Sequence, residues 1–407
     1  MSHPTQPTQP AKPTEQSLRA ELASLPADLR DRLARAGFDE SVLVSLARPL
    51  LERAAAGAPD ASHHDRNRVS GVVEAPRPGD VVPAATQGSA EYDRLAAIGS
   101  ASLARGEVAF CVLAGGMATR MGGVVKALVP AFDDRTFLDL RLHENATWSR
   151  RAGKPVPLWL MTSEPTDGPI RDELQRHSAP AHVATFRQNL GLRLTREGAL
   201  FRDDAGQPST YAPGHGDLPE ALRRSGLLAS FVAAGGRTVW IANLDNLGAT
   251  IDPAILGLFA ESSADVLVEV APKAPGDRGG IPVWADARGA DGSVVRRLQV
   301  LEEFRLPPGF DASTVPVFNT NTFLVRADAL LHAHAASTWF EVEKQVDGRT
   351  AVQFERLLQE LTAQMPAAYA RVSRDGAASR FLPVKDYGEL NTRRDEIRAV
   401  AQGRGMM

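Results

Sequence analysis

The segment LAGGMATRMGGVVKALVP, residues 113–130, combines glycines with two basic residues directly after an apolar run. Its glycines are Gly115, Gly116, Gly122 and Gly123. Glycines let the backbone approach a ligand closely, and N–H groups in such loops point at phosphate oxygens. Arg120 and Lys126 add positive charge where a triphosphate would bind. The spacing matches neither the G-x-G-x-x-G fingerprint nor the G-x-x-x-x-G-K-[ST] loop, so a structural turn stays an alternative at this point.

A second segment, APGHGDLPEAL, holds His215 and Asp217 on a tight turn before a helical pattern. The N-terminus of a helix favours anions, so this turn suits a phosphate or the edge of a nucleotide. The alternative is that Asp217 only caps the helix.

The third segment, ANLDNLGATID, follows an expected strand and carries Asn243 and Asp245 at its end. Open α/β sheets bind ligands at the carboxyl ends of their strands. Mg²⁺ takes one or two carboxylates together with phosphate oxygens, which makes Asp245 a candidate ligand for that ion. Ordinary turn chemistry is the alternative for an Asp-Asn pair in this position.

Two further segments supply polar groups. FNTNTFLV places Asn319 and Asn321 at the entrance of a strand, where their amides bind sugar hydroxyls or form an Asx turn. RFLPVKDYGEL presents Lys385 after a short apolar run. Only six of the 46 basic residues are lysines, so Lys126 and Lys385 are less expected here as random surface charge.

The elements that position these residues are apolar runs separated by helical patterns. Alternation of this kind predicts an α/β fold with a doubly wound, mixed or parallel sheet. Helical patterns cover residues 90–105 and 216–236. The expected strands are VAFCVLAGG and the runs at 157–163, 238–246, 264–272 and 321–330.

The rest of the chain divides by composition. We predict a disordered tail over residues 1–16, a helical segment with a linker over 17–100, and a main domain over 101–407. The part from 57 to 89 is rich in proline, glycine and polar residues and is interpreted as a loop.

Composition excludes several classes of protein. The net charge is −3 and no basic tract stands out, so nucleic acid is not an expected partner. We expect no signal segment and no membrane span, because the start is polar and no apolar run is long enough. Cys111 is the single cysteine, which rules out a disulfide within the chain. The expected location is the cytoplasm.

Taken together, the motifs resemble the UTP–glucose-1-phosphate uridylyltransferase family, the UDP-glucose pyrophosphorylases of eukaryotic type. The resemblance covers roughly residues 105–400. The matching segments are Leu113–Gly122 with Lys126, Ala212–Asp217, Asn243–Ala249, Arg278–Gly280, Val300–Pro307, Phe318–Thr322 and Phe381–Lys385. The departures are Val125 in place of a proline, Met117-Ala118 in place of Leu-Gly, and Arg278 in place of a lysine.

The resemblance implies a glycosyltransferase-A-like nucleotidyltransferase fold, here with an N-terminal helical extension. The family usually continues into a left-handed β-helix domain, which we expect this chain to lack. The implied reaction joins UTP to a sugar 1-phosphate and releases pyrophosphate. The G-H-G-D form of the second motif favours glucose over N-acetylhexosamine as the sugar.

Residue roles follow from the same resemblance. Mg²⁺ on Asp245 would bridge the α-phosphate, Arg120 and Lys126 would hold the phosphates that leave, and Lys385 would bridge the two reacting phosphates. The uracil would contact Leu113, Ala114, Gly115, Gly116, Gln188 and Gly214. His215 would contact phosphate, and the sugar would contact Asn243, Gly280, Glu302 and Asn321. A solvated acid is an equally weighted interpretation of Glu302.

Three other functions compete with this one. The chain could use another sugar 1-phosphate, as a UDP-N-acetylhexosamine or broad UDP-sugar pyrophosphorylase, because sequence does not place the pocket walls. It could be an inactive UDP-sugar-binding protein, although the retention of Lys126, Asp245 and Lys385 together speaks against this. A nicotinamide dehydrogenase fails for lack of the fingerprint and of a ribose-binding acid. We expect a monomer or a small homo-oligomer.

Overall fold

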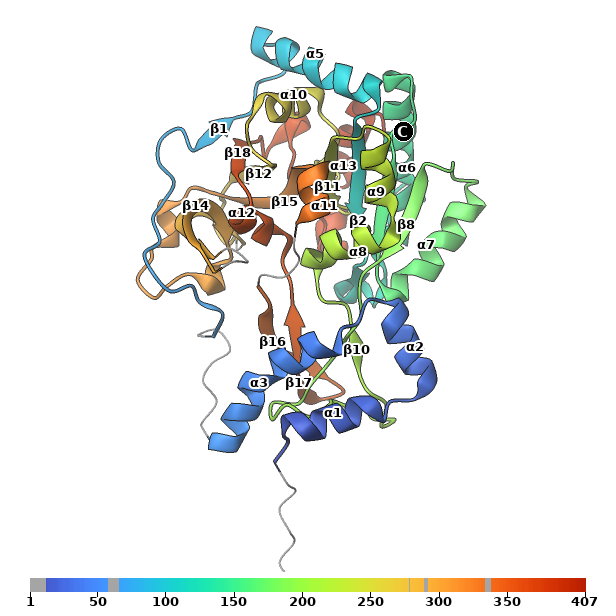
Figure 1. Cartoon of the computed structure of the whole chain (residues 1–407). Coiled ribbons are helices and arrows are strands. Elements are labelled where there is room, and N and C mark those ends of the chain that lie inside the picture. Colours follow the sequence, from blue (N-terminus) through green and yellow to red (C-terminus); the bar gives the residue numbers. More distant parts are fainter. Residues whose placement is uncertain (1–11, 58–65, 278, 289–291, 334–337) are drawn as a thin grey trace, which may run out of the picture. The chain divides into compact units, whose positions relative to one another are not determined.

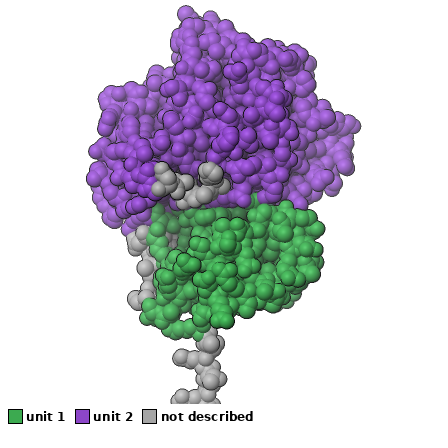
Figure 2. Space-filling view, viewed as in Figure 1, with its two compact units in different colours: residues 1–67, 189–213, 339–355 green, residues 68–188, 214–338, 356–407 purple. Residues whose placement is uncertain are grey.

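The computed structural model describes residues 12–57, 66–277, 279–288, 292–333 and 338–407, which form two compact units (Figure 1). Figure 2 colours the units, one built from residues 1–67, 189–213 and 339–355 and the other from 68–188, 214–338 and 356–407. Each unit thus combines three separate segments, and the contiguous domain division at residue 100 remains a prediction. Of the tail predicted to be disordered, residues 1–11 lie outside the described part, and the last two belong to helix α1 (Glu15–Ala23).

The smaller unit packs three amphipathic helices against short strands. Helix α1 begins with a capping box at Thr14, and α3 begins at Asp39, whose carboxylate accepts backbone N–H groups. Buried leucines of all three helices share one apolar cluster with Leu192, Val352 and Phe354. The other elements are α2 Ala27–Arg35, α3 Glu40–Ala56, β9 Gly191–Leu192, β10 Thr210–Tyr211, β16 Phe340–Val346 and β17 Arg349–Glu355.

The larger unit is organised by an eight-stranded sheet with the order β1-β18-β12-β15-β11-β2-β7-β8. All neighbouring pairs are parallel except those that β15 makes with β11 and β12. The sheet is therefore mixed, as predicted. Its strands are β1 Val81–Pro83, β2 Val108–Leu113, β7 Leu158–Thr162, β8 Val183–Arg187, β11 Thr238–Asn243, β12 Val266–Pro272, β15 Val317–Arg326 and β18 Ala367–Arg371.

Two strand predictions need correction. The segment 57–89, interpreted as a loop, contains β1, which pairs with β18 at the edge of the sheet. A run of only three residues, bounded by Asp80 and Ala84, is too short to be recognised by periodicity. The strand predicted at 321–330 instead begins at Val317 and ends at Arg326, where helix α11 (Ala327–His332) takes over.

Helices cover both faces of this sheet. Phe110 of β2 and Trp159 of β7 point to opposite faces, because Trp159 is in register with Cys111, the residue next to Phe110. Phe231 of helix α9 (Leu227–Ala233) packs edge-on against Trp159, whereas the guanidinium of Arg141 on helix α6 (Phe137–Ala152) lies over the Phe110 ring. Helices α6 and α9 therefore lie on opposite sides, which is the doubly wound arrangement that the sequence predicted.

The remaining elements of the larger unit connect and flank the sheet. The helical pattern 216–236 forms two helices, because Gly226 has a positive φ of 75° between them. No helix among the described residues is both long and apolar enough to cross a membrane. The helices are α5 Ala90–Arg105, α6 Phe137–Ala152, α7 Glu164–Arg176, α8 Leu218–Ser225, α9 Leu227–Ala233, α10 Pro253–Glu261, α12 Leu361–Gln364 and α13 Tyr387–Gly403. The short hairpins are β3 Met117–Ala118 with β4 Val124–Val125, β5 Pro130–Phe132 with β6 Arg135–Thr136, and β13 Ile281–Arg288 with β14 Val294–Leu301.

Candidate functional site

The predicted site residues gather at one edge of the eight-stranded sheet. Strands β11, β2, β7 and β8 are parallel neighbours, so their carboxyl ends meet at this edge. Asn243 ends β11, the glycine loop follows β2, and Gln188 follows β8. The antiparallel strand β15 begins at the same edge and brings Asn319 and Asn321 beside Asn243.

The glycine loop folds back on itself. Its strands β3 and β4 pair Met117 with Val125, and Gly122 and Gly123 make the turn between them with positive φ values. The Lys126 N–H then donates to the Gly116 carbonyl at 3.3 Å. Val125, which stands where the related family has proline, therefore belongs to an antiparallel hairpin that returns the chain to the start of the loop.

Lys126 and Asp245 are in direct contact. The Lys126 Nζ donates to the Asp245 Oδ2 at 2.5 Å, and the two side chains are 19 % and 16 % exposed. Asp245 therefore lies against the loop lysine, an arrangement that turn chemistry alone does not require. The contact joins the phosphate-binding loop candidate to the metal-ligand candidate.

A second group consists of Gly115, Gln188 and Gly214. The Gln188 Nε2 donates to the Gly214 carbonyl at 2.8 Å, and the buried amide lies against Gly115. A Cβ at Gly115 would be 2.6 Å from the Gln188 Oε1, so a larger residue there would have to displace the Gln188 amide. Gly214 has φ of 90°, and a Cβ on it would meet the Arg356 carbonyl at 2.7 Å. The two glycines thus bracket the amide that the resemblance assigns to uracil.

The turn at His215 and Asp217 is held by a neighbouring segment. Asp217 is fully buried and forms an ion pair with Arg356, and its side chain makes no capping bond to α8. Asp217 therefore occupies the N-cap position of α8 but does not cap the helix with its side chain. The Leu358 N–H donates to the His215 Nδ1 at 2.9 Å. Because Nδ1 accepts, the proton of a neutral His215 ring is on Nε2, where it can be donated to a phosphate oxygen.

Asn243 and Asn321 form a third group. The Asn321 Nδ2 donates to the Asn243 Oδ1 at 2.8 Å, and the Asn321 N–H donates to the Asn319 Oδ1 at 2.9 Å. The pairing of β12 with β15 shifts register between Glu269 and Val270, which leaves Asn321 outside the ladder with φ of 59°. The buried Asn321 Oδ1 has no hydrogen-bond partner among the described residues. The Asx turn is thus formed by Asn319, while Asn321 retains an acceptor that a hydroxyl donor could satisfy.

Gly280 and Glu302 lie together beside this group. Gly280 accepts a hydrogen bond from the Asn319 N–H at 2.8 Å, and its own N–H binds the Glu302 carboxylate. Gln359 donates its amide to the same carboxylate. Burial, with added repulsion from Glu303 and Glu360, raises the pKa of Glu302 to about 7. Glu302 is therefore a partly buried, hydrogen-bonded acid, which argues against its interpretation as a solvated one.

Two predicted residues make no side-chain contact with the others. Arg120 is exposed in the loop, and Lys385 is exposed just before α13. No hydrogen bond or ion pair joins either side chain to the described residues. Leu113 and Ala114 end β2 and enter the loop, where their backbone groups pair with Leu244 and Met161. Arg278 lies outside the described residues.

Several residues of the site were missed at the level of sequence. Arg141, Asn246, Arg380 and Gln359 are all buried and bind the segments that carry predicted residues. An arginine on an amphipathic helix normally indicates a solvated face, so nothing in the local pattern distinguished Arg141. Asn246 and Arg380 belong to motifs that were recognised in the sequence, and their position in these motifs was the one indication of a role in the site.

The chain is similar to known proteins over most of its length. A family model described as UTP–glucose-1-phosphate uridylyltransferase matches residues 78–406. A protein of Schizosaccharomyces pombe named probable UTP–glucose-1-phosphate uridylyltransferase is 30 % identical over 301 residues, 72 % of this chain and 54 % of that protein. The UTP–glucose-1-phosphate uridylyltransferase of Saccharomyces cerevisiae is 30 % identical over 303 residues, 70 % of this chain and 58 % of that protein. The chain therefore spans a little over half the length of these relatives.

Solved structures show the same fold. A UDP-glucose phosphorylase from Trypanosoma brucei superposes with a TM-score of 0.67 at 22 % identity, covering 89 % of this chain and 77 % of that one. A UDP-N-acetylglucosamine pyrophosphorylase from Trypanosoma brucei gives a TM-score of 0.68 at 19 % identity, covering 95 % and 85 %. These similarities confirm the predicted fold class.

Proposed function

The chain belongs to the UTP–glucose-1-phosphate uridylyltransferase family, and on this premise we propose that it transfers a uridylyl group from UTP to a sugar 1-phosphate, with glucose 1-phosphate preferred. The observation that carries the proposal is the contact between Lys126 and Asp245. It unites a cation for the nucleotide phosphates with a carboxylate for a metal ion at the carboxyl edge of the sheet. The reaction needs both groups at one point.

The phosphate chemistry is assigned to cations and to a histidine. A sugar 1-phosphate oxygen attacks the α-phosphorus of UTP, the bond to the β-phosphate oxygen breaks, and pyrophosphate leaves. Both reactants are polyanions, so charge neutralisation and positioning supply most of the catalysis. Lys126 and Arg120 bind the departing phosphates, Lys385 binds the sugar phosphate and the α-phosphate, and His215 donates from Nε2.

The base is bound by a slot between two glycines. Gln188 supplies an amide, and Gly115 and Gly116 supply backbone groups. Uracil offers adjacent donor and acceptor atoms that match an amide. A purine is larger and would leave polar groups of the slot without partners, which costs about 1–3 kcal/mol for each buried group. The slot therefore favours UTP over ATP and GTP.

A divalent metal ion, most simply Mg²⁺, fits Asp245 only together with a nucleotide. No cluster of three histidine, cysteine or acidic residues in the described part of the chain could hold an ion alone. Mg²⁺ commonly takes one carboxylate and completes its shell with water and substrate phosphates. Asp245 would hold the ion, which when bound neutralises charge on the α-phosphate. Lys126 limits access to one of the Asp245 oxygens in the absence of substrate.

The sugar is assigned to the amides and the partly buried acid. Asn243, Asn321, Gly280 and Glu302 form a continuous chain of contacts through Asn319. The unpaired Asn321 Oδ1 accepts from a sugar hydroxyl, and Glu302 offers a second polar group. A site built to bind hydroxyls discriminates strongly against sugars that lack them.

The test is pyrophosphate release by the purified chain. UTP is supplied with glucose 1-phosphate, galactose 1-phosphate or N-acetylglucosamine 1-phosphate, and glucose 1-phosphate is then supplied with ATP or GTP. We expect UTP with glucose 1-phosphate to give the highest kcat/KM. Equal rates with ATP would refute the uracil slot, and binding of UDP-glucose without any pyrophosphate release would favour an inactive binding protein.

A further inference from the structure

We propose that Arg141, a residue of helix α6, positions the loop that carries Asp245. The Arg141 side chain is fully buried, and all five of its N–H groups are used. Nε donates to the Leu244 carbonyl at 3.4 Å, Nη1 to the Ala249 carbonyl at 3.1 Å and to Glu144 at 2.7 Å, and Nη2 to the carbonyls of Asn243 at 3.1 Å and Asn246 at 2.6 Å.

The four carbonyls belong to one loop, and they enclose Asp245. Asn243 and Leu244 precede it, and Asn246 and Ala249 follow it. Because the backbone is fixed on both sides of Asp245, the position of its carboxylate depends only on the side-chain torsion angles. Glu144 completes the attachment, since it accepts from the Ile251 N–H at 3.0 Å as well as from Arg141. Arg141 and Glu144 together therefore bind both carbonyl and N–H groups of the loop backbone.

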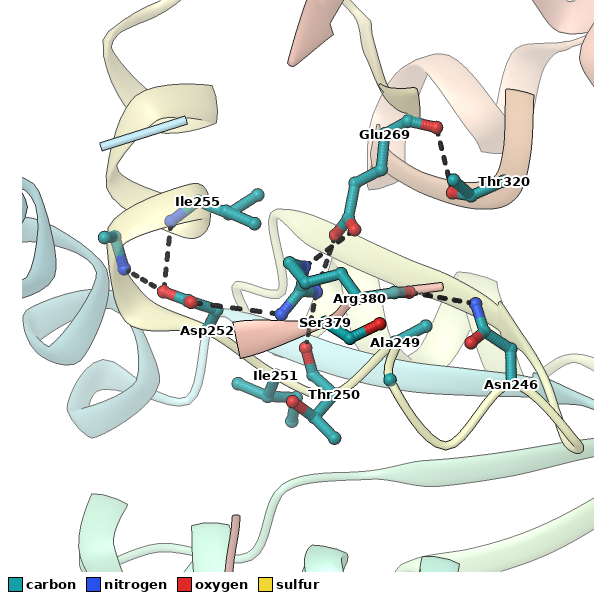
Figure 3. A network of polar contacts seen from close by, with 12 residues as sticks. Asn246, Ala249, Thr250, Ile251, Asp252, Ile255, Glu269, Thr320, Ser379 and Arg380 are labelled. Atoms are coloured by element: carbon teal, nitrogen blue, oxygen red, sulfur yellow. Dashed lines mark hydrogen bonds and ion pairs between the residues drawn. The ribbon is translucent and has the colours of Figure 1, made fainter. Parts of the chain in front are cut away.

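The loop is also held on its other side. The Asn246 amide donates to the Arg380 carbonyl at 3.1 Å, and its oxygen accepts from the Leu382 N–H at 2.7 Å. Residues 380–385 carry Lys385, so this amide links the Asp245 loop to that lysine. Figure 3 shows Arg380 continuing the network to Glu269 and to the Thr250 carbonyl. Arg141 thus anchors one end of a connection between two predicted site residues.

Stability alone does not account for this guanidinium. A buried ion pair is often no more stabilising than apolar residues of the same volume. Four of the Arg141 N–H groups donate to loop carbonyls, and these carbonyls need a partner only because the loop has this conformation. Some residues hydrogen-bond the segment that carries a metal ligand and so fix the orientation of that ligand. Mutation of such a residue typically lowers metal affinity or activity about 10–100-fold. We infer that Arg141 supports metal binding and activity by fixing the position of Asp245. This inference rests on the proposed uridylyl transfer.

The experiment compares Arg141→Lys with Arg151→Lys. Lysine keeps the charge but has three donors without the planar fork, so it cannot bind all four carbonyls. Arg151 is on the same helix but is exposed over Trp148, which makes it the matched control. One readout is the kcat, together with the affinity for UTP without a metal ion. The other is the binding of Mn²⁺ in the presence of UTP, followed by electron paramagnetic resonance without sugar phosphate.

For Arg141→Lys we expect Mn²⁺ affinity and kcat each to fall about 10–100-fold. The affinity for UTP without a metal ion should change little, because the uracil slot is untouched. Arg151→Lys should match the wild type in both. An Arg141→Lys protein that melts at a lower temperature yet keeps wild-type kcat and Mn²⁺ affinity well below that temperature would overturn the inference. Pyrophosphate release by the wild type tests the transfer reaction separately, since Mn²⁺ binding needs no turnover.

Discussion

The Lys126 ammonium group lies 2.5 Å from the Asp245 carboxylate, and this ion pair joins the glycine loop to the end of β11. Both groups are largely shielded from water, so bulk salt screens them less than an exposed pair. In the chain without substrate, each group neutralises the other. We expect an entering triphosphate to take Lys126 as its metal ion takes Asp245, so that the two charges exchange partners without leaving the site.

The first prediction concerns Lys126. Lys126→Ala removes a cation from phosphate oxygens whose charge redistributes as the α–β bond breaks, and loss of one such contact costs on the order of 10²–10³ in kcat. The measurement is the steady-state rate of pyrophosphate release. Lys154→Ala is the control, because Lys154 is exposed and, among the described residues, its side chain bonds only the Arg105 carbonyl, at 3.3 Å. Similar rates for both variants would contradict the phosphate role of Lys126.

The second prediction concerns Asp245. Asp245→Asn keeps the shape of the side chain but removes the charge that Lys126 and a metal ion share. We expect cooperative melting near the wild-type temperature together with loss of most turnover. Chelation by EDTA should silence the wild type and be reversed by Mg²⁺. Full activity of the wild type in EDTA would remove the metal from the proposal.

Much of the site was predictable because its chemistry is local in sequence. Glycines beside basic residues, and amides at the ends of strands, can be predicted as site residues from their type and their position in the sequence. The contacts between segments were not predictable, since they depend on which strands become neighbours. Asp217 occupies the N-cap position of α8, as one interpretation of the sequence had it, but its side chain pairs with Arg356, 139 positions along the chain.

The fold, like the site, was predictable in its local features and not in its long-range contacts. Long apolar runs predicted the central strands, because a buried parallel strand is apolar on both faces. The antiparallel direction of β15 was not predictable, since strand direction leaves no trace in an apolar run. The association of residues 189–213 and 339–355 with the N-terminal helices depends on contacts distant in sequence. Arg141 and Glu144 were missed because buried charges that satisfy each other look like surface charges in the sequence.

The third prediction compares a glycine of the uracil slot with one outside it. Gly115→Ala puts a methyl group 2.6 Å from the Gln188 Oε1, which must displace the amide and strain its bond to the Gly214 carbonyl. A mispaired buried amide costs about 1–3 kcal/mol, so KM for UTP should rise roughly 5–150-fold. Gly168→Ala in α7 is the control, since a Cβ there meets nothing within 4 Å and Gly168 is not a predicted site residue. Equal effects of the two alanines on KM for UTP would mean that the Gln188 amide does not bind the base.

The last prediction concerns the pH dependence of stability. Burial is the main cause that raises the pKa of Glu302 to about 7, and Glu303 and Glu360 add repulsion. The ordinary value of 4.5 applies to the unfolded chain. Between these two values the folded chain holds a proton that the unfolded chain has lost. The resulting stability is fully present below pH 4.5 and is lost as the pH rises through 7.

Glu302→Gln removes this titration while keeping a polar group of the same size beside Gln359. The free energy of unfolding of the wild type, minus that of the variant, should therefore fall by on the order of 3 kcal/mol from acid to neutral pH. Urea unfolding of both proteins at several pH values measures the difference. Glu303→Gln is the control, because the neighbouring Glu303 acts on Glu302 only through its charge. It should reduce the slope and not abolish it. A constant difference between wild type and Glu302→Gln would show that Glu302 titrates as an ordinary carboxylate.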